Sequence, residues 1–199
     1  MVNWRDLFDL GGKVAGFLAL ILQGVGAVLR RRRTPKIHIH PFDPAHDLKT
    51  WRLDPAGTEI RRAVTLDVSN KGADTATRCV ATLEVTKTPP YIKLEERRYA
   101  LHWAGVEYSF QNTGSQPVDI GPETRRLDVT FTRQSQSIRG CWIATPAALS
   151  LASVDQAYLP PGDYECVLKV SCENEHGAKL RMKLRSPNEW FELAATFSR

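Results

Sequence analysis

The sequence predicts an all-β fold, an antiparallel sandwich of about eight strands, preceded by one N-terminal α-helix. Short runs in which apolar and polar residues alternate recur from residue 37 onward, and a period of two is the signature of a strand with one buried face. Segments rich in Gly, Pro, Asn and Asp separate these runs. One unbroken apolar run lies near the N-terminus. We therefore divide the 199 residues into a short amphipathic segment (1–13), a membrane helix (14–29), a basic linker (30–36) and the sandwich (37–199).

The N-terminal helix is predicted from the run VAGFLALILQGVGAVLRRRR at residues 14–33. Its sixteen uncharged residues would rise about 24 Å as a helix, which is short of a hydrocarbon core of about 30 Å. Snorkelling by Lys13 and Arg30, with some thinning of the bilayer, can close this gap. The alternatives are a cleaved signal peptide, a buried helix and an amphipathic surface helix. Acidic side chains precede the run, and only Gln23 interrupts it, which favours a single membrane span. The expected interfacial anchors are Trp4, Arg30, Arg31, Arg32 and Arg33.

The positive charge of the chain is confined to its N-terminal part. The formal net charge is +5, and residues 1–36 carry all of it, because residues 37–199 hold equal numbers of basic and acidic side chains. By the positive-inside rule, the basic residues after the apolar run place the sandwich in the cytoplasm. The electrical balance of the sandwich leads us to expect no nucleic-acid partner.

Small residues line one face of the predicted membrane helix. Gly12, Gly16, Ala19, Gln23 and Gly26 follow one another at intervals of three or four residues. Such a seam lets helix backbones approach closely, and a Gln can hydrogen-bond across the contact. Self-association is one interpretation of this pattern, and the ordinary abundance of Gly and Ala in membrane helices is the other.

Five predicted strands show the clearest alternation. Each has apolar side chains at every second position, and they cover residues 64–68, 79–85, 127–131, 164–172 and 180–184. No long amphipathic helix is predicted after residue 36. The Pro-rich stretch at residues 41–57 is predicted to be a loop.

Two segments of the predicted sandwich resemble a known family. LDVSNKGADTATRCVATLEV, residues 66–85, reads as strand, Asn-x-Gly turn and strand, and LPPGDYECVLKVSCENEHG, residues 159–177, reads as a late hairpin with a Pro-Gly turn. Both resemble immunoglobulin-like sandwiches such as the CARDB-type adhesion modules. The resemblance implies an immunoglobulin-like sandwich, covers roughly 40 of the 199 residues and implies no functional residue. Residues 97–125 depart from the pattern, so their strand order is not predicted.

The cysteines are predicted to be free thiols in the core. The chain has four cysteines and no Cys-x-x-Cys motif. Cys79, Cys166 and Cys172 share the parity of the buried faces of their strands, where a thiol packs as a small apolar group. Free thiols agree with a reducing compartment and therefore with a cytoplasmic sandwich.

A histidine cluster in the stretch IHIHPFDPAHD is a weak candidate for a metal site. His38 and His40 would project from the same face of a strand, and His46 follows in a short loop. Two imidazoles at this spacing with a nearby carboxylate can bind zinc, but a solvent-facing strand is the interpretation that we favour. We predict neither a bound metal nor a cofactor.

Catalytic motifs are missing from the sequence, and we expect no enzymatic activity. Trp103 and Trp142 would mark a ligand or partner site if they lay in exposed loops, and would belong to the core otherwise. Arg125, from one of three adjacent arginine pairs, is a candidate contact for an anionic ligand.

These observations favour a single-pass membrane protein whose sandwich is a non-enzymatic interaction or assembly module on the cytoplasmic side. Its expected partners are the lipid bilayer and either another protein or further copies of the chain. One alternative is an oligomeric membrane effector that senses a ligand. The other is an adhesion or carbohydrate-binding domain at the cell surface, which requires the opposite topology.

Overall fold

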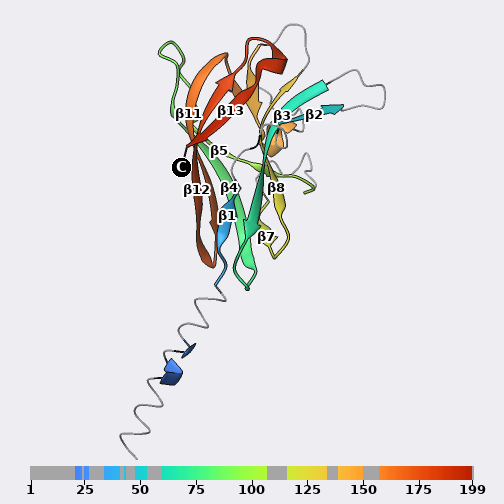
Figure 1. Cartoon of the computed structure of the whole chain (residues 1–199). Helices are drawn as coiled ribbons and strands as arrows, with labels where there is room; N and C mark the ends of the chain where they lie inside the picture. Colours follow the sequence, from blue (N-terminus) through green and yellow to red (C-terminus); the bar gives the residue numbers. More distant parts are fainter. Residues whose placement is uncertain are drawn as a thin grey trace, which may run out of the picture.

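The computed structural model of the chain describes residues 21–23, 25, 26, 34–40, 43, 48–52, 60–106, 116–133, 139–149 and 157–198. They form a two-layer antiparallel β-sandwich, in which the two sheets face one another across the core (Figure 1). The predicted all-β antiparallel sandwich is therefore confirmed. The described part also contains two single-turn helices, α3 (Pro146–Leu149) and the 3-10 helix η1 (Trp190–Glu192).

One sheet has seven strands among the described residues. Its main path runs in the order β1-β3-β8-β9-β10, with β2 beside β3 and β6 beside β8. The strands are β1 (Ile37–Ile39), β2 (Leu48–Arg52), β3 (Ile60–Asn70), β6 (His102–Trp103), β8 (Arg125–Arg133), β9 (Cys141–Ile143) and β10 (Tyr158–Leu159).

The second sheet has six strands among the described residues. Its main path runs in the order β13-β12-β11-β4-β5, and β7 also pairs with β4. The strands are β4 (Ala76–Lys87), β5 (Arg98–Ala100), β7 (Val118–Ile120), β11 (Gly162–Cys172), β12 (Glu175–Ser186) and β13 (Ala194–Ser198). The five runs with the clearest alternation fall in β3, β4, β8, β11 and β12, as the sequence predicted.

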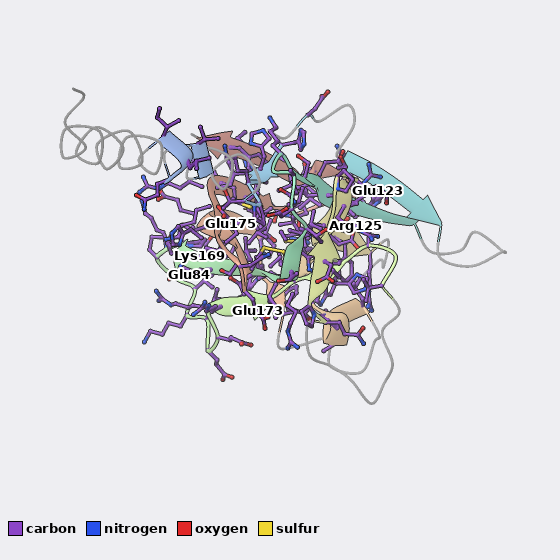
Figure 2. All side chains as sticks on the ribbon, turned by 90° about the horizontal axis from the view of Figure 1, so that it is seen from below. Glu84, Glu123, Arg125, Lys169, Glu173 and Glu175 are labelled. Carbon is purple, nitrogen blue, oxygen red and sulfur yellow. A yellow bond between two sulfur atoms is a disulfide. The ribbon has the colours of Figure 1, made fainter. Side chains whose placement is uncertain are left out.

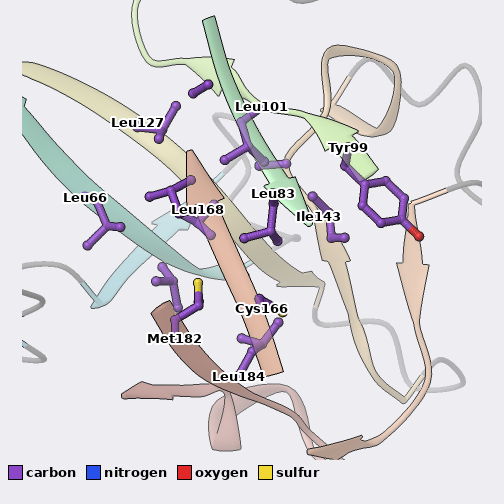
Figure 3. Close-up of a cluster of buried hydrophobic side chains, with 14 of the residues drawn as sticks. Leu66, Leu83, Tyr99, Leu101, Leu127, Ile143, Cys166, Leu168, Met182 and Leu184 are labelled. Atoms are coloured by element: carbon purple, nitrogen blue, oxygen red, sulfur yellow. The ribbon is translucent and has the colours of Figure 1, made fainter. Parts of the chain in front are cut away.

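The core lies between the sheets and is built from the apolar half of each alternating strand. Figure 3 shows Leu66 and Leu127 of one sheet together with Leu83, Leu168 and Met182 of the other. These side chains are at most 2% exposed. Because burial of apolar surface is the main favourable contribution to folding, the alternation is sufficient to specify which face of each strand turns inward.

Two sequence predictions about the seven-stranded sheet were wrong. The stretch 41–57 is not entirely a loop, because its residues 48–52 form β2. β1 pairs with residues 68–70 of β3 and β2 with residues 60–64, so two short strands share one edge of a long one. β8 also does not have a single buried face, because Asp128, Thr130 and Thr132 are buried as well as its apolar residues. A register shift opposite Val64 and Thr65 interrupts the alternation of this strand.

The N-terminal segment enters the sandwich at a fixed point. The Asn70 side chain accepts hydrogen bonds from the backbone N–H groups of Lys36 and Gly72, at 2.8 and 2.9 Å, and donates to the carbonyls of Asp74 and Ile120. The backbone N–H of Lys71 donates to the carbonyl of Lys36 at 2.8 Å. The buried amide of Asn70 therefore uses all of its hydrogen bonds to join the incoming chain, the β3–β4 turn and the end of β7.

Candidate functional site

A row of cations on one strand is the most distinctive surface feature of the described chain. β12 contains the sequence KLRMKLR, in which Lys179, Arg181, Lys183 and Arg185 are exposed while Met182 and Leu184 are buried. Residues two apart on a strand lie on the same face about 6.7 Å apart. These four side chains, called the cation ladder below, therefore extend along the outer face of the six-stranded sheet for about 20 Å.

Neighbouring strands add further charges to this face. The β11–β12 register pairs Lys169 with Lys179 and Glu165 with Lys183, and directly paired residues project to the same side. We call the resulting outer surface the basic face. Its charged side chains are Glu84 and Lys87 of β4, Arg98 of β5, Asp163, Glu165 and Lys169 of β11, and the cation ladder of β12. Seven cations thus face three carboxylates, although residues 37–199 as a whole are neutral.

Ion pairs neutralise only part of the basic face. Glu84 pairs with Lys169, Glu165 with Lys87 at 3.3 Å and Asp163 with Arg185 at 3.0 Å. The hydrogen bond and charge of Lys169, with smaller contributions from Arg98 and Lys179, lower the pKa of Glu84. Within the part of the chain that the structure describes, Arg98, Lys179, Arg181 and Lys183 form no ion pair, so their charge is available to an external anion.

Two grooves border the basic face. One has a volume of about 730 Å³ and lies between the 87–91 segment and the ends of β11, β12 and β13, with Lys183 and Tyr91 in its lining. The other has a volume of about 960 Å³ and is lined by Ile37 and His38 of β1 together with Lys169, Lys179 and Arg181. The strand through which the N-terminal segment enters the sandwich therefore lies beside the cation ladder.

Arg125 does not belong to the basic face. It begins β8 of the other sheet, and Figure 2 shows it beside Glu123, on the opposite side of the sandwich from Glu84 and Lys169. Its side chain is exposed. Arg125 belongs to a pair of adjacent arginines, whereas the basic face arises from cations two residues apart.

Trp103 and Trp142 are buried, at 2% and 1% exposed. They would mark a partner site only if they lay in exposed loops, and they do not. Trp103 lies in β6, and the Trp142 ring packs against Phe131 and Tyr158 with ring centroids 6.0 and 5.4 Å apart. The Arg133 guanidinium lies 5.3 Å from the centroid of the Trp142 ring. These aromatic side chains belong to the packing of the seven-stranded sheet.

A buried histidine–aspartate pair is the feature closest to a catalytic arrangement. His102 Nδ1 lies 3.3 Å from Asp128 Oδ2, and His102 Nε2 donates to the Val106 carbonyl at 2.8 Å. Both ring nitrogens are thus engaged within the fold, and the pair holds residues 102–106 against β8.

The prediction for the cysteines was partly wrong. Cys79 and Cys172 form a disulfide, with their Cα atoms 4.1 Å apart, whereas Cys141 and Cys166 are buried free thiols. The β4–β11 register pairs Val80 with Ser171, so Cys79 and Cys172 are the next facing pair. Shared burial parity is compatible with separate core thiols, but it also allows two such residues on neighbouring strands to face each other. The disulfide removes the support that free thiols gave to a reducing compartment.

His38 and His40 project from the same side of β1, with ring centroids 5.0 Å apart. His40 Nε2 lies 2.8 Å from the Ser69 hydroxyl, so a fold contact already engages this imidazole. His46 lies outside the described residues. No group of three metal-ligating side chains occurs in the described ranges.

Most of the predicted membrane segment also lies outside the described residues. This applies to Trp4, Arg30, Arg31, Arg32 and Arg33, and to Gly12, Gly16 and Ala19 of the small-residue seam. Gln23 and Gly26 are described and helical, and nearby Leu22 is 70% exposed. Among the residues described, no helix is long and apolar enough to cross a membrane.

Comparisons with protein-family models, with curated proteins and with solved structures find no match to this chain.

Proposed function

We propose that the chain is a membrane-anchored, non-enzymatic interaction module whose sandwich binds an anionic partner through the basic face. The observation that carries this proposal is the cation ladder, because three of its members are exposed on a regular strand without a partner in the described structure. Like charges on residues about 6.7 Å apart along a strand repel one another, so an anionic partner would relieve a cost that the isolated fold carries. The apolar run at 14–29 and the arginines that follow it support the anchor.

We further propose that the sandwich is immunoglobulin-like and of the CARDB type. β1, β3 and β8 correspond to strands A, B and E of that fold, and β4, β11 and β12 to strands C, F and G. The hydroxyl of Tyr164, near the start of β11, donates to the carbonyl of Pro160 at 2.7 Å. This contact is the tyrosine corner typical of immunoglobulin-like domains.

Retention of the full chain, in detergent micelles, on immobilised heparin tests the proposed binding surface. Arg181→Gln/Lys183→Gln should elute at a clearly lower salt concentration than the unaltered chain. Arg125→Gln/Arg139→Gln removes the same charge from exposed positions outside the basic face and should elute close to the unaltered chain. Equal losses in the two variants would mean that only net charge matters, and the proposal would fail.

The disulfide favours a second candidate function. Disulfides persist in oxidising compartments, so Cys79–Cys172 supports an exported sandwich acting in adhesion or carbohydrate binding, whereas the arginine run supports a cytoplasmic one. These two candidate functions are separated by counting free thiols. Cells are treated with acid to stop thiol exchange, and the chain is then denatured and its free cysteines are alkylated. Four alkylated cysteines would support the cytoplasmic module, and two would favour the exported domain.

A further inference from the structure

We infer that the partner of the basic face is the anionic phospholipid surface of the membrane in which the chain is anchored, so that the sandwich lies with its six-stranded sheet against the headgroups. This inference rests on the proposed function and names the partner that the geometry favours. It follows from where the chain enters the sandwich, from which strand lies beside the entry point, and from the shape of the charged surface.

The entry point limits how far the sandwich can be from the membrane. The hydrogen bonds of Lys36 with Asn70 and Lys71 fix the chain at the start of β1. Four residues, 30–33, separate the end of the predicted span at residue 29 from Thr34, where the described chain resumes, and the five Cα–Cα steps between residues 29 and 34 reach at most about 17 Å. The potential of the membrane surface falls off within a Debye length of about 8 Å, so the charges nearest the entry point experience it when the entry point lies closer to the surface than this maximum reach.

The strand beside the entry point carries the cation ladder. Ile37 and His38 of β1 line the same groove as Lys179 and Arg181 of β12. The unpaired cations therefore begin where the basic linker, with Arg30–Arg33, ends. A basic segment next to a membrane span binds anionic headgroups, and the ladder extends this positive charge along the folded domain.

The shape of the basic face also fits a headgroup layer. Its cations are distributed over four adjacent strands, β4, β5, β11 and β12. A broad sheet surface with exposed Lys and Arg side chains can contact many separate phosphates without requiring a particular sequence or shape of partner. An acidic protein could satisfy the same charges, but nothing in the anchored geometry would bring it to this face in preference to the lipid.

Energy transfer in nanodiscs containing the full chain tests the inference. A donor dye is attached to Thr196→Cys, an exposed position paired with Lys183 on the outer face of β13, and an acceptor-labelled lipid is placed in the disc. Transfer should be higher in discs with phosphatidylglycerol than in discs of phosphatidylcholine alone. Each cation at an anionic surface contributes about fivefold to binding, so Arg181→Gln/Lys183→Gln should lower the ratio of bilayer-bound to free sandwich roughly 25-fold. Arg125→Gln/Arg139→Gln should leave the difference between the discs unchanged.

The outcomes separate this inference from the proposed function. Equal transfer in the two kinds of disc, or a difference that survives loss of Arg181 and Lys183, overturns the lipid assignment. If the same variant still loses heparin retention, the basic face binds an anionic macromolecule other than the lipid and the proposed function stands. If heparin retention is also unchanged, both are wrong.

Discussion

Opening the Cys79–Cys172 disulfide should substantially weaken the sandwich. The bridge closes a loop of 93 residues, and chain entropy alone assigns such a loop about 4.6 kcal/mol of stabilisation at 25 °C. Measured losses for native disulfides are commonly about 2–5 kcal/mol, against a total stability of about 5–15 kcal/mol for a domain. The bridge also joins β4 to β11, the two central strands of the six-stranded sheet, so its loss affects the support of the basic face.

Urea unfolding of the full chain in micelles, followed by tryptophan fluorescence, measures this effect. With a denaturant dependence of about 2 kcal/mol per molar, Cys79→Ala/Cys172→Ala should unfold at a midpoint lower by about 1–2.5 M. Reductant should shift the unaltered chain by a similar amount and leave the double variant unchanged. An unaltered chain whose midpoint does not respond to reductant would refute the assignment of a stabilising disulfide.

Three other perturbations test the packing and ionisation of the fold. Leu168→Ala removes a fully buried side chain from the core and should cost about 2–5 kcal/mol in urea unfolding; a cost below 1 kcal/mol would contradict the core assignment. Burial raises the pKa of Cys141 and Cys166 from 9.0 to about 12, so stability that is complete below pH 9 should be lost as the pH rises toward 12. Thermal melts between pH 9 and pH 12 compare the unaltered chain with Cys141→Ala/Cys166→Ala. If both lose the same stability as the pH rises, the two thiols are not the cause. His102→Leu leaves Asp128 buried without its partner and should cost about 3–5 kcal/mol, whereas in Asp128→Asn the amide can donate to Nδ1 and the cost should be under about 1.5 kcal/mol. Equal losses of stability in His102→Leu and Asp128→Asn would contradict this interpretation of the pair.

The alternating pattern predicted the strands well because burial of one face is a local property of a sequence. It located the regions of β3, β4, β8, β11 and β12, and the Asn-x-Gly turn at Asn70 was read correctly. It failed for β2, whose pairing depends on the free part of an edge of β3 rather than on its own pattern. The order of strands between residues 97 and 125 also could not be predicted, because β5 and β7 join one sheet and β6 the other.

The candidate site was harder to predict, although part of its signal was present. The apolar positions of KLRMKLR predict the strand β12, and the cations at its alternate positions form the exposed row of the basic face. The neutral charge of residues 37–199 concealed the basic face, because net charge does not report how charges are distributed over a folded surface. The disulfide was missed for a related reason, since only the register of β4 against β11 brings Cys79 and Cys172 together.

Lysine footprinting with a bound polyanion tests the central claim most directly. The full chain is acetylated with and without a heparin oligosaccharide, and modification of each lysine is measured by mass spectrometry. The account predicts protection of Lys179 and Lys183 on the basic face, with Lys71 and Lys93, exposed elsewhere, modified equally in both samples. Protection of Lys71 and Lys93 with no change at Lys179 and Lys183 would place the binding surface elsewhere and contradict the account.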